Sequence, residues 1–146
     1  MALHRAEQIL ASVLTTVTSL TTTGANAKRN YLHPFDAAVT SGIYVIMGSD
    51  IPVDLSDRNL AYIDYNLEVI LSVHVKNSTP ETQINLIKKE ITIALMADYT
   101  QGLAFVLDTM ELGWEQPELV DAEKPTAVVQ GRFEIKYRRS LTDPSA

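Results

Sequence analysis

The chain has 146 residues, and its 18 acidic against 12 basic side chains give a formal net charge of −6. This length suits one domain with its own core, spanning residues 1–146. A duplex-binding domain normally carries a basic face, so the charge argues against nucleic-acid recognition. The sequence contains no cysteine, which excludes disulfides, thiol nucleophiles and cysteine-bound metals. No apolar run is long enough to span a membrane, so no membrane partner is expected.

The first predicted element is a helix from Ala2 to about Leu20. Its apolar side chains recur three and four residues apart and form one stripe, namely Leu3, Ala6, Leu10, Val13, Val17 and Leu20. Gly24 follows as a candidate C-terminal cap. Residues 25–41 have little periodicity and are expected to be loop or edge structure.

Two strands are predicted next. The apolar run 43–47 is a short strand, and a polar connection over residues 50–59 follows it. Residues 60–76 form the strongest strand pattern of the chain, because apolar side chains alternate with mostly polar ones from Tyr65 to Val75. This period of two predicts one buried and one mostly polar face.

The second half begins with a helix near Ser78, whose buried side should carry Ile84, Ile87, Ile91 and Leu95. Residues 103–114 are predicted as a strand with Ala104, Val106, Asp108, Met110 and Leu112 on one face. An acidic loop is expected over residues 115–125, then a long strand from Thr126 to about Ser140. The last six residues are expected to be frayed.

The predicted element order is α-β-β-α-β-β. This order indicates an α+β fold with two layers, in which two helices pack on one face of a mainly antiparallel sheet of about four strands.

The search for chemistry finds acidic clusters but no catalytic motif. Asp50, Asp54 and Asp57 share one predicted loop, and Glu115 and Glu118 share another. The first cluster lacks the spacing and glycine of an EF-hand, so a solvated turn is preferred to a cation site. No nucleophile elbow, phosphate-binding glycine loop or paired histidine motif occurs. We therefore expect no catalytic residue, no cofactor and no metal, and the chain is not expected to be an enzyme.

The one basic concentration lies on the last predicted strand. Arg132, Lys136 and Arg138 fall on the same face because they are separated by even numbers of residues, with Glu134 between them. In an acidic protein this arrangement favours an electrostatic contact between subunits or with a partner, although a solvated edge strand fits equally well.

Several segments of the sequence resemble the tail terminator (tail completion) proteins of long-tailed bacteriophages, of the minor tail protein U type. The resemblance covers most of the chain. It rests on the opening helix, the short strand at residues 42–46, the long strand at 65–73, the helix end at 94–98 and the final strand at 133–137. Ser41 and Gly42 stand where the family commonly has a proline before the first strand.

The resemblance implies a structural virion protein at the head-proximal end of the tail, assembled in the host cytoplasm. Such proteins form a hexameric ring on the last tail-tube ring, stop tube polymerisation and present a surface to the head-completion proteins. The implied partners are therefore further copies of the chain, the tube protein and a head-completion or connector protein. Asp50, Asp54, Asp57, Glu115, Glu118, Arg132, Lys136 and Arg138 are the candidate interface residues.

Two other functions stay open at this stage. The chain could be another head–tail connector or neck subunit, which would bind portal or adaptor instead of tube. It could also be a small enzyme that uses carboxylates distant in the sequence, in which case a deep pocket should hold at least two carboxylates with perturbed pKa.

Overall fold

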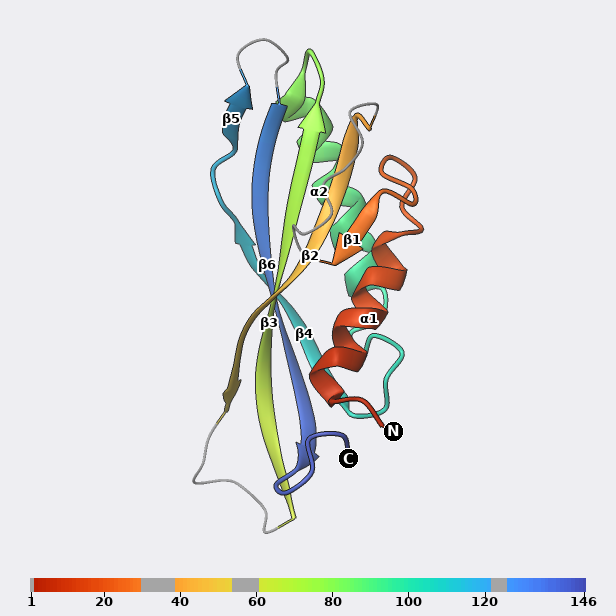
Figure 1. Cartoon of the computed structure of the whole chain (residues 1–146), viewed down its shortest axis with the longest axis vertical. Helices are drawn as coiled ribbons and strands as arrows, with labels where there is room; N and C mark the ends of the chain where they lie inside the picture. The colour runs from red at the N-terminus through yellow and green to blue at the C-terminus, as the bar shows by residue number, and fades with distance from the viewer. Residues whose placement is uncertain (1, 30–38, 54–60, 122–125) are drawn as a thin grey trace.

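The computed structural model describes residues 2–29, 39–53, 61–121 and 126–146. Two helices and six strands follow one another along the chain (Figure 1). Their bounds are α1 (Arg5–Val17), β1 (Ala27–Arg29), β2 (Ser41–Pro52), β3 (Tyr62–Lys76), α2 (Pro80–Met96), β4 (Val106–Trp114), β5 (Glu118–Asp121) and β6 (Thr126–Ser140). The predicted α+β class is confirmed, with six strands in place of about four.

The strands form one sheet in the order β1-β2-β3-β6-β4, and β5 also pairs with β6. β1 runs parallel to β2, while every other pairing is antiparallel. β3 and β6 are each 15 residues long and pair along their whole length, from Tyr62 opposite Ser140 to Lys76 opposite Thr126. These central strands run most of the length of the molecule and twist strongly along it (Figure 1).

Both helices cover the same face of the sheet, here called the inner face (Figure 1). α1 buries Ala6, Ile9, Leu10, Val13 and Val17, and α2 buries Ile84, Ile87, Ile91 and Leu95. The buried side of α2 is the predicted one. The odd-numbered residues of β3 from Leu67 to Val75 and of β6 from Ala127 to Tyr137 form the sheet side of the core, as period-two patterning requires. Ile43 and Val45 of β2 and Val106 of β4 join them.

α1 is shorter than predicted at both ends. It begins after His4, whose ring Nδ1 accepts the backbone N–H of Ala6 at 3.0 Å. This cap leaves Leu3 outside the helix and 58% exposed. The helix ends at Val17, where the hydroxyls of Thr18 and Ser19 donate to carbonyls three residues earlier. Such bonds compete with continued helical pairing.

Two short strands were not predicted. β1 lies in the segment expected to be loop or edge structure, and β5 lies in the expected acidic loop. β2 also continues to Pro52, so Asp50 belongs to a strand and the prediction of a polar connection from residue 50 is wrong there. Strands of three or four residues take their conformation from the neighbour with which they pair, and they carry little periodicity of their own.

The predicted facing of β4 is wrong. Bulges between Val106 and Asp108 and between Glu111 and Gly113 each shift the alternation by one residue. As a result Val106 and Thr109 are the buried residues of the strand, while Met110 is exposed.

The C-terminal tail is bonded to the domain, contrary to the predicted fraying. The backbone N–H of Leu141 donates to the carbonyl of Ala61 at 3.1 Å. The carbonyl of Pro144 accepts the N–H of Arg5 at 2.9 Å, which ties the tail to the start of α1.

Candidate assembly surface

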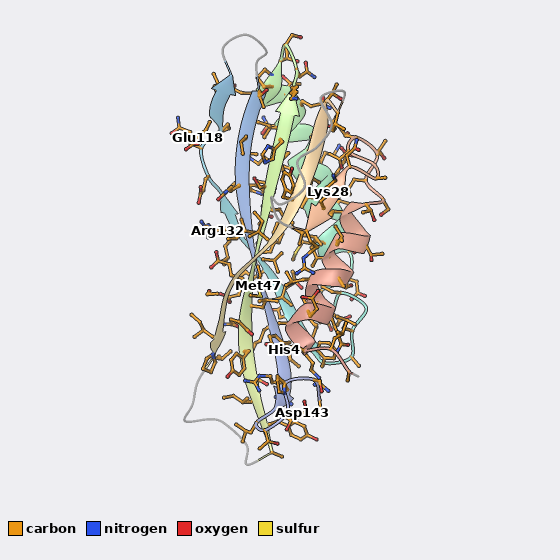
Figure 2. The ribbon with its side chains drawn as sticks, viewed as in Figure 1. His4, Lys28, Met47, Glu118, Arg132 and Asp143 are labelled. Atoms are coloured by element: carbon orange, nitrogen blue, oxygen red, sulfur yellow. The ribbon has the colours of Figure 1, made fainter. Side chains whose placement is uncertain are left out.

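The sheet face that carries no helix, here called the outer face, displays the basic residues of β6. The even-numbered positions of β3 and β6 point to this face, because their odd-numbered neighbours lie in the core. Arg132, Lys136 and Arg138 therefore share it with Glu134, in the arrangement expected from the sequence. In Figure 2, Arg132 and Glu118 lie on the opposite side of the molecule from α1.

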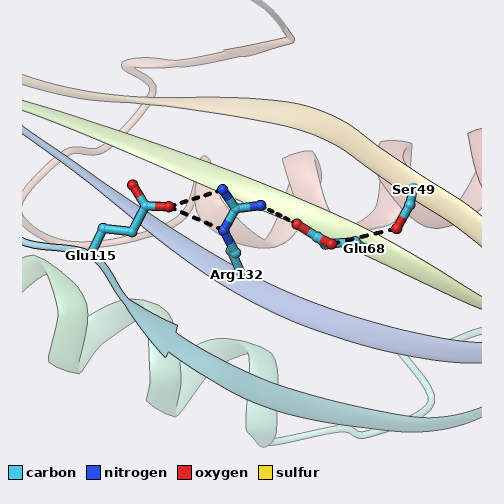
Figure 3. A network of polar contacts seen from close by, with 4 residues as sticks. All are labelled: Ser49, Glu68, Glu115 and Arg132. Atoms are coloured by element: carbon cyan, nitrogen blue, oxygen red, sulfur yellow. Dashed lines mark hydrogen bonds and ion pairs between the residues drawn. The ribbon is translucent and has the colours of Figure 1, made fainter.

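Arg132 is the centre of a polar network on this face (Figure 3). Its guanidinium forms an ion pair with Glu68 of β3. On its other side, Nη2 and Nε donate to Oε1 of Glu115 at 2.9 and 3.2 Å. Ser49 of β2 extends the network by donating to Glu68 at 3.4 Å. The hydrogen bond to Glu115, followed by that to Glu68, raises the pKa of Arg132 above its ordinary value.

Arg138 and Lys136 differ in their pairing. Arg138 binds Asp64 through two bonds, from Nε to Oδ1 at 2.8 Å and from Nη2 to Oδ2 at 3.3 Å. These contacts raise the pKa of Arg138. Within the described parts of the chain, Lys136 forms no ion pair. Most of the basic concentration is thus balanced inside the subunit, whereas Lys136 has no ion-pair partner among the described residues.

The acidic candidates do not form one cluster. Asp50 points to the inner face, where it accepts the hydroxyl of the buried Tyr137 at 2.9 Å to each oxygen. Asp54 and Asp57 lie outside the described residues. Glu115 binds Arg132, and Glu118 is exposed at the start of β5. Of the six candidate interface residues that lie within the described ranges, only Arg132 and Glu115 form an ion pair with each other.

Among the residues that the structure describes, the sheet also has two unlike open edges, which sequence analysis did not identify. β1 pairs only with residues 43–45 of β2, so no described strand pairs with the outer edge of β2 over residues 46–52. At the opposite side β4 is the terminal strand. Large apolar side chains are exposed along both: Met47 and Ile51, each 56%, on β2, and Leu107, Met110 and Leu112 on β4. The broken alternation of residues 103–114 was the only sequence signal for such an edge.

The described residues contain no group of three or more His, Asp or Glu side chains that could hold a metal ion. Asp98 and Asp143 are the carboxylates whose pKa is lowered, in each case mainly by a hydrogen bond from a hydroxyl two residues later, Thr100 or Ser145. Both are exposed turn residues. No helix within the described ranges has both the length and the apolar character needed to cross a membrane.

No protein-family model and no curated protein sequence matches the chain. Among solved structures, it is similar to a chain described as "Virion of native gene transfer agent (GTA) particle", with a TM-score of 0.49 and 14% sequence identity over 94% of this chain and 96% of that chain.

Proposed function

We propose that this protein is a structural virion protein, a tail terminator that forms a hexameric ring on the end of a phage tail tube. The ring stops polymerisation of the tube protein and offers its free side to a head-completion protein. The protein acts by binding and assembly, without a catalytic step.

The observation that carries this proposal is the pair of unlike open edges on one sheet. An interface between two different surfaces of identical subunits is heterologous, and it gives a closed ring when the rotation between copies closes. The exposed side chains Met47 and Ile51 on one edge and Met110 and Leu112 on the other supply apolar area for such an interface. Two equivalent open edges would instead have favoured a symmetric dimer.

The sequence resemblance supports the same function from an independent direction. Its segments fall on α1, β2, β3, α2 and β6, which form most of the described fold. The outer face supplies a further polar surface, on which Lys136 has no ion-pair partner among the described residues. That surface is available to the tube or to the head-completion protein.

The first test is the mass of the purified protein by light scattering over a dilution series. Six copies of the 16.2 kDa chain weigh about 97 kDa. The second test adds the protein to polymerising tube protein and measures tube lengths by electron microscopy. We expect shorter tubes with a cap at one end. Tubes of unchanged length and bare ends, together with binding to portal or adaptor, would replace the terminator with a connector subunit.

A further inference from the structure

We infer that the subunits join by strand pairing, with β4 of one copy lying antiparallel against residues 46–52 of β2 in the next copy. The partner is thus a second copy of this chain, and the sheet continues from subunit to subunit. This inference deepens the proposed ring and rests on it, because it assigns the surfaces through which the ring would close.

The strand directions suit this pairing. β2 is antiparallel to β3, β3 to β6, and β6 to β4, so β2 and β4 run in opposite directions within one subunit. When neighbouring copies keep the same orientation, as in a ring, β4 of one copy is therefore antiparallel to β2 of the next. Antiparallel pairing needs no crossover connection and is the commoner type.

The two open edges also lie at the same height in the sheet. Following the paired residues across the sheet, Pro52 lies on one row with Tyr65, Tyr137 and Val106. At the other end of the open segment, Ile46 lies on one row with Ile70, Arg132 and Gly113. The stretch of β2 that no described strand pairs with thus covers the same rows as β4. A neighbour can dock sideways, without sliding along the strands.

The side chains at this height are complementary in character. Ile51 and Met110 both point to the outer face, since they pair with Asn66 and Glu134. They would form a diagonal apolar contact across the new pair of strands, because Ile51 shares its row with Asp108, two residues before Met110. Further along the strands, Lys28 of β1 and Glu115 after β4 bring opposite charges to one row, where Glu115 also binds Arg132 of its own subunit. Lys28 lies on the same row as Tyr44, Ser72 and Gln130. The carbonyl of Gln130 accepts the N–H of Glu115 at 2.9 Å, which places Glu115 at this row.

Bulges restrict which strand can use these edges. β2 has an irregularity between Met47 and Asp50, and β4 has two. Bulged edges pair poorly with arbitrary strands, which protects a free subunit from unselective aggregation. Such an edge pairs best with a strand whose own bulges give it a matching bend.

Cysteine pairs test the inference, since the natural chain has no cysteine. Asp108→Cys is combined with Ile51→Cys in one chain, because the two positions share a row through Asn66 and Lys136. The purified protein is then oxidised and separated under non-reducing conditions. Side chains that lie directly opposite each other on neighbouring strands can approach closely enough for a disulfide, whereas diagonal neighbours lie too far apart. We expect a ladder of covalent multimers that ends at six copies.

Two controls measure how much non-specific cross-linking this experiment produces. Each single-cysteine variant should stay monomeric on the gel. Ile51→Cys with Leu119→Cys should give no ladder, because Leu119 is 75% exposed but lies on β5, outside the paired rows.

Each result separates the edge pairing from the ring. A mass near 97 kDa without a ladder would overturn the pairing and leave the ring standing. A ladder that continues past six copies would support the pairing and remove the hexameric ring. A covalent dimer of Ile51→Cys alone would overturn the pairing, because it would bring two β2 edges together. A monomeric mass without a ladder, both alone and with tail tubes, would overturn both.

Discussion

The hydroxyl of Tyr137 in β6 lies 2.9 Å from each carboxylate oxygen of Asp50 in β2, across the intervening strand β3. Tyr137 is fully buried, and Asp50 is half-buried at the rim of the inner face. The contact holds β2 at Asp50, within residues 46–52. No described strand pairs with the edge of this segment that faces away from β3. Nearby, Arg139 lies over the ring of Tyr65 at 4.3 Å from its centroid and donates to its hydroxyl at 2.7 Å.

Replacement of Tyr137 by Phe should lower the free energy of unfolding by about 1–3 kcal/mol, because a half-buried carboxylate loses its hydrogen-bond donor. Urea unfolding followed by circular dichroism measures this change. Asp50→Asn is the matched variant, since the amide oxygen still accepts the hydroxyl, and it should cost less. Equal losses for both variants would argue against a role for this bond.

The stability of the protein should fall in alkaline solution through Tyr137. Burial, followed by the bond to Asp50, raises the pKa of Tyr137 well above the ordinary value of a tyrosine, which is about 10. The folded state therefore retains a proton that the unfolded state releases above about pH 10, and the unfolding free energy decreases there by at most about 1.4 kcal/mol per pH unit for one group. Urea midpoints between pH 8 and 11 should decline less steeply in Tyr137→Phe than in the natural protein. Parallel curves for the two proteins would contradict this assignment.

Thr109 should be sensitive to loss of its hydroxyl. It is 3% exposed, its Oγ1 donates to the carbonyl of Tyr99 at 2.7 Å, and it accepts Nε2 of Gln101 at 3.1 Å. Gln101 has a positive φ of 53°, and its amide also donates to the carbonyl of Leu95 at the end of α2. Thr109→Val should cost about 1–3 kcal/mol, because the buried amide of Gln101 and the carbonyl of Tyr99 each lose a partner. Thr109→Ser keeps the hydroxyl and should remain closer to the natural protein in thermal unfolding.

The contrast between β6 and β4 shows what the sequence could predict. β6 alternates without a break from Thr126, so its bounds and faces followed from the residues alone. β4 contains two bulges, whose positions depend on its pairing with β6 and leave no local motif. Thr109 was therefore missed as a core residue, and β1 and β5 were missed because short strands depend on their neighbours.

The candidate surface was predictable only in part, for the same reason. Period two placed Arg132, Lys136 and Arg138 on one face. The partners of Arg132 are 64 and 17 residues away in the chain, and they reach it through strand order, which local patterns do not encode. Which strands lie at the edges is likewise a property of the whole sheet, so Ile51 and Met110 could not be recognised as an exposed pair.

Gly131 should tolerate no larger residue without movement of Trp114. A Cβ atom at Gly131 would lie 2.6 Å from the indole ring, which also packs edge-on against Phe133. Gly131→Ala should therefore destabilise the protein by about 1–3 kcal/mol. Trp114 is the only tryptophan, so its fluorescence reports the displacement directly. In a Trp114→Ala background the same substitution should cost much less, and an undiminished cost would contradict the steric explanation.

The network around Arg132 should contribute little to folding. Its side chain is 38% exposed, and those of Glu68 and Glu115 are 23% and 53% exposed. Exposed ion pairs typically contribute about 0–1 kcal/mol, and salt screens them. Arg132→Gln should therefore change the unfolding free energy by less than about 1 kcal/mol, with a smaller difference in 1 M salt than in dilute buffer. A loss well above that value would mean that the network stabilises the sheet itself.

Introducing a charge at the open edge of β2 should separate assembly from folding. Ile51→Lys places a positive charge at a position whose side chain is 56% exposed. The free subunit should therefore lose little folding stability by the change. Lysine on an edge strand opposes strand addition, since docking would bury its charge. We expect circular dichroism and the urea midpoint to stay close to those of the natural protein, while light scattering shows a shift towards single copies and tube capping is lost. Leu3→Lys is the matched control, because Leu3 is 58% exposed but lies outside the sheet. If Ile51→Lys assembled and capped tubes as well as Leu3→Lys, the β2 edge could not be the surface through which the ring closes.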